Sequence, residues 1–188
     1  MRATLTLPLA FTLLMSIPTN ASAKDYEESM SQRANGFGFT MYHRLVKAKP
    51  KQNLFFSPYS LYVALGMTMV GAQGATANEI GRVLRFLGHE LRTAPTSFHA
   101  LLLSTHALRR GKSLLRVANA IWPHRRFRLE SRFAKLMRRS FFAKASPLDY
   151  DKPKRARTII NRWAARKTKQ HIKQPGPYTH LTLPTTYS

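Results

Sequence analysis

Apolar residues recur at helical spacing in several stretches of the chain, and we expect a helix in each of them. Ser57 stands where a helix N-cap belongs, and Pro58 would take the first helical position after it. Thr76 and Glu79 form a capping-box pattern with Thr76 as the N-cap. The expected helices lie at about residues 26–47, 57–70, 76–87, 95–108, 133–141 and 151–163.

Short or alternating apolar runs between these helices predict strands. Residues 54–56 form a short apolar run typical of a buried strand, residues 115–121 alternate as a strand would, and residues 148–150 favour a further brief strand. The expected helices and short strands therefore follow one another along the chain. The helix expected at residues 57–70 is apolar around nearly its whole circumference. Such a helix belongs in the middle of a large fold, so this chain is expected to be part of something larger.

The first 23 residues have the pattern of a secretory signal peptide. Arg2 supplies a short positive region, an apolar stretch runs from Leu5 to Ile17, and the small residues Ala21 to Ala23 resemble a cleavage site. The apolar stretch is too short to span a membrane, and no later segment reaches about 18 apolar residues. We therefore expect cleavage after Ala23 and a secreted, extracellular chain that starts at Lys24.

The charge of the chain is extreme and unevenly distributed. The 31 Lys and Arg residues against 8 Asp and Glu residues give a net charge of +23. Residues 109–173 hold 21 of the basic residues and only 3 of the acidic ones. A field of this sign attracts polyanions without choosing among them.

The residue inventory argues against an enzyme. The chain has no cysteine, which excludes disulfides and thiolate chemistry. Its seven histidines show no HExxH spacing, and no G-x-S-x-G motif is present. Neither a phosphate-binding glycine loop nor a zinc-finger, RNA-binding or basic-zipper pattern occurs, so specific nucleic-acid recognition is not expected either.

The residues within this framework resemble the serpin family of serine-protease inhibitors, over about residues 26–174. Departures from the family pattern are the Gln170-His171 pair, where serpins usually have Gly-Lys, and the length, which is roughly half of what a serpin domain needs. The resemblance therefore implies an incomplete, serpin-like α+β fold, with the N-terminal helices and a few strands of the central sheet. The matching segments are residues 53–61 (NLFFSPYSL), 64–80, 118–122 (ANAIW), 127–133, 148–150 and 160–163 (INRW).

The resemblance also implies a mechanism for the complete protein. A target serine protease cleaves an exposed reactive loop, and the loop then inserts as a new strand into the central sheet with the acylated protease attached. No residue here matches the reactive loop, so the chain itself is expected to be inactive and no catalytic or metal-binding residue is assigned. Ser57 and Ser60 match the family's shutter region, where the strands part. A plain helix-cap role for Ser57 and a first-turn position for Ser60 remain compatible with this.

The alternative function is that of a secreted protein that binds polyanions without inhibiting proteases. Some serpins carry a glycosaminoglycan site on the helix that precedes residue 109, and arginine suits sulfate because its planar fork binds through two hydrogen bonds. Apart from a heparin-like glycosaminoglycan, no cofactor is expected. A generally basic surface with no specific site remains open. The candidate residues are Arg109, Arg110, Lys112, Arg116, Arg125, Arg126 and Arg128.

The character of the sequence changes after Gln174. Residues 175–188 contain no charged residue and consist mostly of Pro, Thr, Tyr and Leu. We expect a signal peptide at 1–23, an N-terminal serpin half at 24–174 and a tail at 175–188. The tail is either flexible or foreign to the natural protein, since residues 178–186 resemble translated sequencing-adapter read-through. A third possibility for the whole chain is a fragment with no activity of its own.

Overall fold

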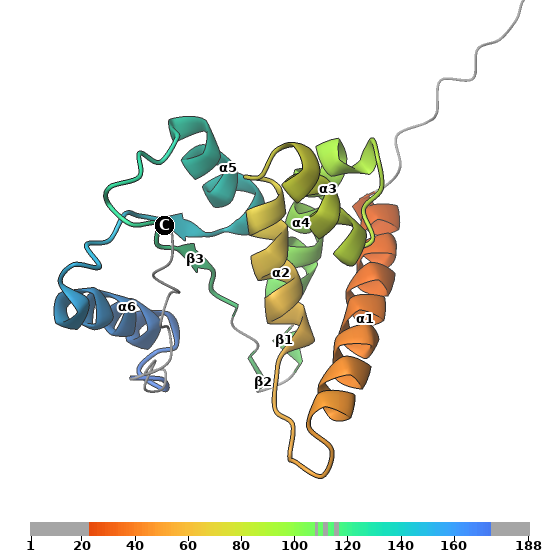
Figure 1. Ribbon diagram of the computed structural model, residues 1–188, viewed down its shortest axis with the longest axis horizontal. Coiled ribbons are helices and arrows are strands. Elements are labelled where there is room, and N and C mark those ends of the chain that lie inside the picture. The colour runs from red at the N-terminus through yellow and green to blue at the C-terminus, as the bar shows by residue number, and fades with distance from the viewer. Residues whose placement is uncertain (1–22, 108, 111–112, 115–116, 174–188) are drawn as a thin grey trace, which may run out of the picture.

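The computed structural model describes residues 23–107, 109–110, 113–114 and 117–173. Nearly all of the expected signal peptide and the whole expected tail lie outside these residues. Figure 1 shows the order of the helices and strands. The helices are α1 (Ala23–Ala48), α2 (Pro58–Met69), α3 (Gly74–Val83), α4 (Glu90–Ala107), α5 (Ser131–Phe141) and α6 (Pro153–Lys167), and the strands are β1 (Arg109–Arg110), β2 (Ser113–Leu114), β3 (Ala120–Ile121) and β4 (Lys144–Ala145).

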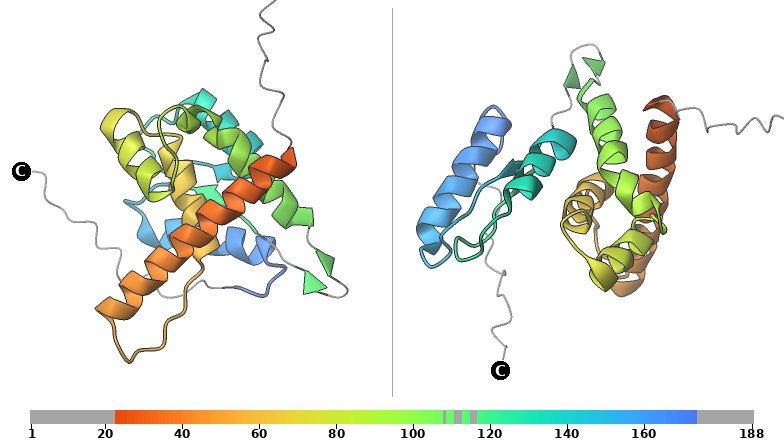
Figure 2. Two further views of the ribbon diagram at one scale, coloured as in Figure 1. Left: turned by 90° about the vertical axis from the view of Figure 1, so that its right-hand side faces the viewer. Right: turned by 90° about the horizontal axis from the view of Figure 1, so that it is seen from above.

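The helices α1 to α5 pack together, and α6 lies apart from them. α1 packs along both α4 and α2, and α5 packs on α4 from the other side. α6 and α1 lie at opposite ends of the molecule, as Figure 1 and the right panel of Figure 2 both show. The described structure is therefore a helical body with two small sheets and one peripheral helix beside it.

The described strands form two small sheets. β1 and β2 pair antiparallel, whereas β3 and β4 pair parallel, with Ala120 opposite Lys144 and Ile121 opposite Ala145. A single bridge between His124 and Leu148 continues the parallel direction. The chain thus contains the start of a parallel sheet between α5 and α6 (Figure 1). Together with the helices, this makes an incomplete α+β fold of the expected class.

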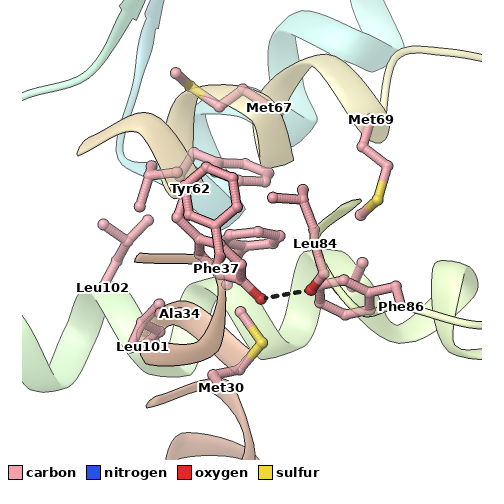
Figure 3. Close-up of a cluster of buried hydrophobic side chains, with 14 of the residues drawn as sticks. Met30, Ala34, Phe37, Tyr62, Met67, Met69, Leu84, Phe86, Leu101 and Leu102 are labelled. Atoms are coloured by element: carbon pink, nitrogen blue, oxygen red, sulfur yellow. Dashed lines mark hydrogen bonds between the residues drawn. The ribbon is translucent and has the colours of Figure 1, made fainter. Parts of the chain in front are cut away.

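The core is a cluster of apolar side chains shared by the first five helices (Figure 3). Phe98 of α4 is fully buried, and its ring centroid lies 5.4 Å from that of Tyr62, 5.7 Å from Phe86 and 5.0 Å from Phe141. Gly66 of α2 makes room for this ring, because a Cβ at that position would lie 2.2 Å from Phe98 Cζ. The buried Tyr62 hydroxyl donates a hydrogen bond of 3.1 Å to the Leu84 carbonyl (Figure 3). Its polar group is therefore satisfied inside the core.

An ion pair between Arg33 and Glu90 joins α1 to the start of α4. The sequence did not indicate this pair. The Arg33 guanidinium donates to both carboxylate oxygens of Glu90 and to the Arg85 carbonyl, and its cationic carbon lies 4.7 Å from the Phe86 ring centroid. The hydrogen bonds from Arg33 and from the Leu87 amide hold the pKa of the Glu90 carboxyl below its ordinary value. Two elements 57 residues apart in sequence are joined in this way.

The strand predictions needed correction. Residues 54–56 form no strand within the described part of the chain, and Phe55 is fully exposed. An extended segment becomes a strand only when a neighbour satisfies its backbone groups, and no described residue does so here. In the run 115–121 only β3 is assigned as strand, residues 115 and 116 lying outside the described residues. Residues 148–150 contribute one bridge, and β4 was not predicted.

Two helix starts also differ from expectation. α3 begins at Gly74 with Gln73 as N-cap, so Thr76 lies inside the first turn and the predicted capping box does not form. Gly74 has a φ of +57°, which lets the chain turn into the helix earlier than a residue with a side chain would. α4 begins at Glu90 rather than Pro95, so Pro95 lies inside the helix, where its missing N–H leaves the Leu91 carbonyl without its usual intrahelical donor. The other predicted helices are confirmed within a few residues.

Candidate functional site

Ser57 and Ser60 lie together at the N-terminus of α2. Ser57 is the N-cap and accepts a hydrogen bond of 3.3 Å from the Ser60 backbone N–H. The two hydroxyl oxygens are 2.9 Å apart, so one hydroxyl donates to the other. Both residues are exposed. The cap role of Ser57 is confirmed, and each hydroxyl keeps the capacity to exchange its partner for another backbone group.

Replacing Ser57 by alanine is expected to lower the free energy of unfolding by about 1 kcal/mol, because the amide of Ser60 loses its acceptor. Thermal unfolding of the complete serpin that contains these residues would measure the change. Ser57→Asp is the matched control, since aspartate also caps helices, and it should retain most of the stability. Equal losses in the two variants would show that Ser57 acts through something other than its cap.

Two of the candidate polyanion-binding arginines form ion pairs with the loop before α6. Arg125 Nε lies 3.2 Å from a carboxylate oxygen of Asp149, and Arg126 Nη2 lies 3.1 Å from one of Asp151. His124 completes the cluster, with its Nε2 atom 3.5 Å from Asp151. These contacts join residues 124–126 to residues 149–151, so part of the positive charge is used inside the fold.

The Asp151 carboxyl is held ionised by its neighbours. Desolvation opposes this, but the Arg126 charge and the hydrogen bond to His124 outweigh it and lower the pKa of Asp151 from its ordinary value. The pair is solvent-exposed, so its contribution to stability is small.

Among the other candidates, Arg128 is exposed and forms no ion pair with a described residue. The backbone of Arg109 and Arg110 forms β1. Lys112 and Arg116 lie outside the described residues. No hydrogen bond or ion pair between described residues links the serine pair to the arginine cluster. The polyanion prediction for these residues therefore stays a prediction.

The two tryptophans and Asn119 support the fold around the short parallel sheet. The Asn119 side-chain amide donates a hydrogen bond of 3.1 Å to the Phe141 carbonyl, and Trp122 meets Trp163 of α6 edge to face, with ring centroids 5.9 Å apart. Trp163 Nε1 is buried and has no partner among the described residues. These contacts hold α6 against the β3 segment.

The described residues contain neither a candidate metal site nor a candidate membrane-spanning helix. No three His, Asp or Glu side chains among them come together in a way that could hold a metal ion. None of the described helices combines the length and the apolar character that crossing a membrane would need.

Comparisons with known proteins agree on one family. A family model described as "Serpin (serine protease inhibitor)" matches residues 32–183. An uncharacterised serpin-like protein of Thermococcus kodakarensis is 33% identical over 162 residues, 84% of this chain and 37% of that protein. Serpin A3-6 of Bos taurus is 30% identical over 82% of this chain and 39% of its own length.

Solved structures show the same relationship. A cleaved Serpin 42Da matches with a TM-score of 0.68 and 28% identity, covering 83% of this chain and 40% of that chain. Human thyroxine-binding globulin shares the fold with a TM-score of 0.70 at 24% identity, over 78% of this chain and 40% of its own. The described fold is thus part of a larger domain, from a family whose members are inhibitors rather than enzymes. The chain belongs to the serpin family, and it spans about 40% of the length of the relatives it matches.

Proposed function

We propose that this chain forms the N-terminal part of a secreted serpin that inhibits a serine protease. Family membership carries the proposal, with identities of about 30% to serpins. The parallel β3–β4 pair supports it, because β3 has no second strand partner among the described residues and further strands could add to that edge. Strand addition is the step on which the family's inhibition depends.

The proposed reaction begins with the target protease. Its serine hydroxyl attacks a peptide carbonyl in the reactive loop of the complete protein, the amine side leaves with a proton, and an ester joins protease and inhibitor. Insertion of the cleaved loop as a new strand then prevents water from hydrolysing the ester. The exposed hydroxyls of Ser57 and Ser60 would re-pair with backbone groups as the sheet opens. This chain contributes the sheet start and the hydroxyl pair, but none of the reacting atoms.

The 188 residues alone are expected to form no covalent complex with a serine protease, whereas the complete serpin that contains them is expected to form one. Incubation with trypsin, chymotrypsin and elastase, followed by electrophoresis in SDS, tests both statements. An SDS-stable adduct of the short chain would overturn the first. Cleavage of the complete protein by every protease without any adduct would overturn the proposed inhibition.

Two further observations bear on the proposal. Sequencing the natural transcript beyond the codon for Gln174 would identify the reactive loop and the class of protease it fits. N-terminal sequencing of the secreted protein should start at Lys24 if the signal peptide is removed as proposed. Another start within the folded helix α1 would contradict that cleavage site.

A further inference from the structure

Helix α6 concentrates positive charge that nothing in the described fold neutralises. Its 15 residues include Arg and Lys but no Asp or Glu, and no ion pair among the described residues involves any of them. The nearest acidic residue in sequence, Asp151, already pairs with Arg126 and His124. The exposed cations of α6 are Lys154, Arg155, Arg157, Arg162, Arg166 and Lys167.

Three of these arginines form a stripe along one side of the helix. Arg155, Arg162 and Arg166 are separated by seven and four residues, which places them within an arc of about 40° and along about 16 Å of the helix axis. All three are exposed. Their spacings along the axis, about 6 and 10 Å, are close to the screening length of about 8 Å at physiological salt, so their fields overlap.

This arrangement costs the helix stability. Arg162 and Arg166 are one turn apart and repel each other, and Lys154 and Arg155 lie in the first turn, where the helix dipole disfavours positive charge. Arg166 and Lys167 lie in the last turn, where positive charge complements the dipole, so the cost comes from the first turn and from the repulsion along the stripe. A bound polyanion would relieve that repulsion.

The side chains favour a sulfated sugar polymer over a nucleic acid. Arginine can bind each sulfate through two hydrogen bonds. Trp163, the aromatic residue of α6, is half-buried and packs edge to face on Trp122, so the stripe offers no exposed ring for a base to stack on. We propose that the arginine stripe of α6, formed by Arg155, Arg162 and Arg166, binds a sulfated polysaccharide chain. The site is separate from residues 109–128, and its binding does not depend on protease inhibition.

The test measures affinity for heparin in the complete serpin, before and after removal of the stripe. The variant Arg155→Gln, Arg162→Gln, Arg166→Gln should bind heparin at least about tenfold more weakly at physiological salt, with a smaller dependence on salt concentration. The matched control Arg44→Gln, Lys47→Gln, Lys49→Gln removes the same charge from exposed positions at the end of α1 and beyond it, and its affinity should change by less than about threefold. The variant Arg155→Lys, Arg162→Lys, Arg166→Lys keeps the positive charge but lacks the planar guanidinium groups that bind a sulfate through two hydrogen bonds. It should bind heparin with intermediate affinity.

Each outcome decides the proposal. Equal losses in the stripe variant and the control would show that only net charge matters, and would overturn it. Duplex DNA that competes better than heparin at equal phosphate and sulfate concentration would assign the stripe to nucleic acid instead. Far-ultraviolet circular dichroism of each variant separates lost binding from lost folding, and the lysine version keeps the test valid if the glutamine variant does not fold.

Discussion

Replacing Phe98 by alanine is expected to lower the free energy of unfolding by about 3–5 kcal/mol. Phe98 is fully buried, and its ring contacts Tyr62, Phe86 and Phe141, which come from three other parts of the chain. Gly66 faces the same ring and has no side chain with which to fill the space that alanine would leave. The cost therefore includes a cavity as well as the lost burial. Urea unfolding of the complete serpin that contains these residues would measure it.

Phe127→Ala is the matched control for this substitution. The Phe127 side chain is 70% exposed, so the same chemical change should alter the free energy of unfolding by less than about 0.5 kcal/mol. If Phe98→Ala destabilised the protein no more than the control, the aromatic cluster would not be the centre of the core.

The helices could be predicted from sequence because their signals are local. Ser57 and Pro58 mark the start of α2 through hydrogen bonding and backbone geometry within four residues, and the structure places the cap there. The apolar spacing of α1 and α5 similarly reflects one buried face on each helix. The capping box at Thr76 failed because two patterns compete at neighbouring positions. Gly74 turns the chain into the helix first, which leaves Thr76 too late to cap it.

The site was less predictable, because charge alone does not say which side chains are free. Arg125 and Arg126 were candidates for binding a polyanion, and the structure pairs both with carboxylates from the loop about 25 residues later. Arg155, Arg162 and Arg166 were not singled out, although their helical spacing and the absence of acidic residues after Asp151 are visible in the sequence. The Arg33–Glu90 pair had no local signal at all, since only the packing of α1 on α4 brings it together.

Residues 24–174, expressed alone, are expected to show no cooperative thermal unfolding. The isolated piece would expose large apolar side chains: Phe39, Leu87 and Phe127 are more than 60% exposed, and Phe55 is fully exposed. Phe39 and Phe55 also line one apolar groove together with Tyr42 and Leu54. Exposed apolar area of this kind promotes association rather than a single folded state.

The strands add to this expectation. Each of the two described sheets has two strands of two residues, and so small a sheet is not stable by itself in water. The helical core of α1, α2, α4 and α5 is largely continuous without the sheets. We therefore expect helical far-ultraviolet circular dichroism with a weak near-ultraviolet signal, and binding of a hydrophobic dye, as in a molten globule.

The control for this experiment is the complete serpin under identical conditions, which should unfold in one cooperative step. A single cooperative transition of residues 24–174, with a structured near-ultraviolet spectrum, would contradict the prediction. It would mean that the aromatic cluster around Phe98 suffices to fix one packing despite the exposed groove. The short chain would then be a stable unit, and heparin binding by the α6 stripe could be measured on it directly. Failure of the short chain to fold would instead tie both the stripe and the serine pair to the rest of the serpin domain.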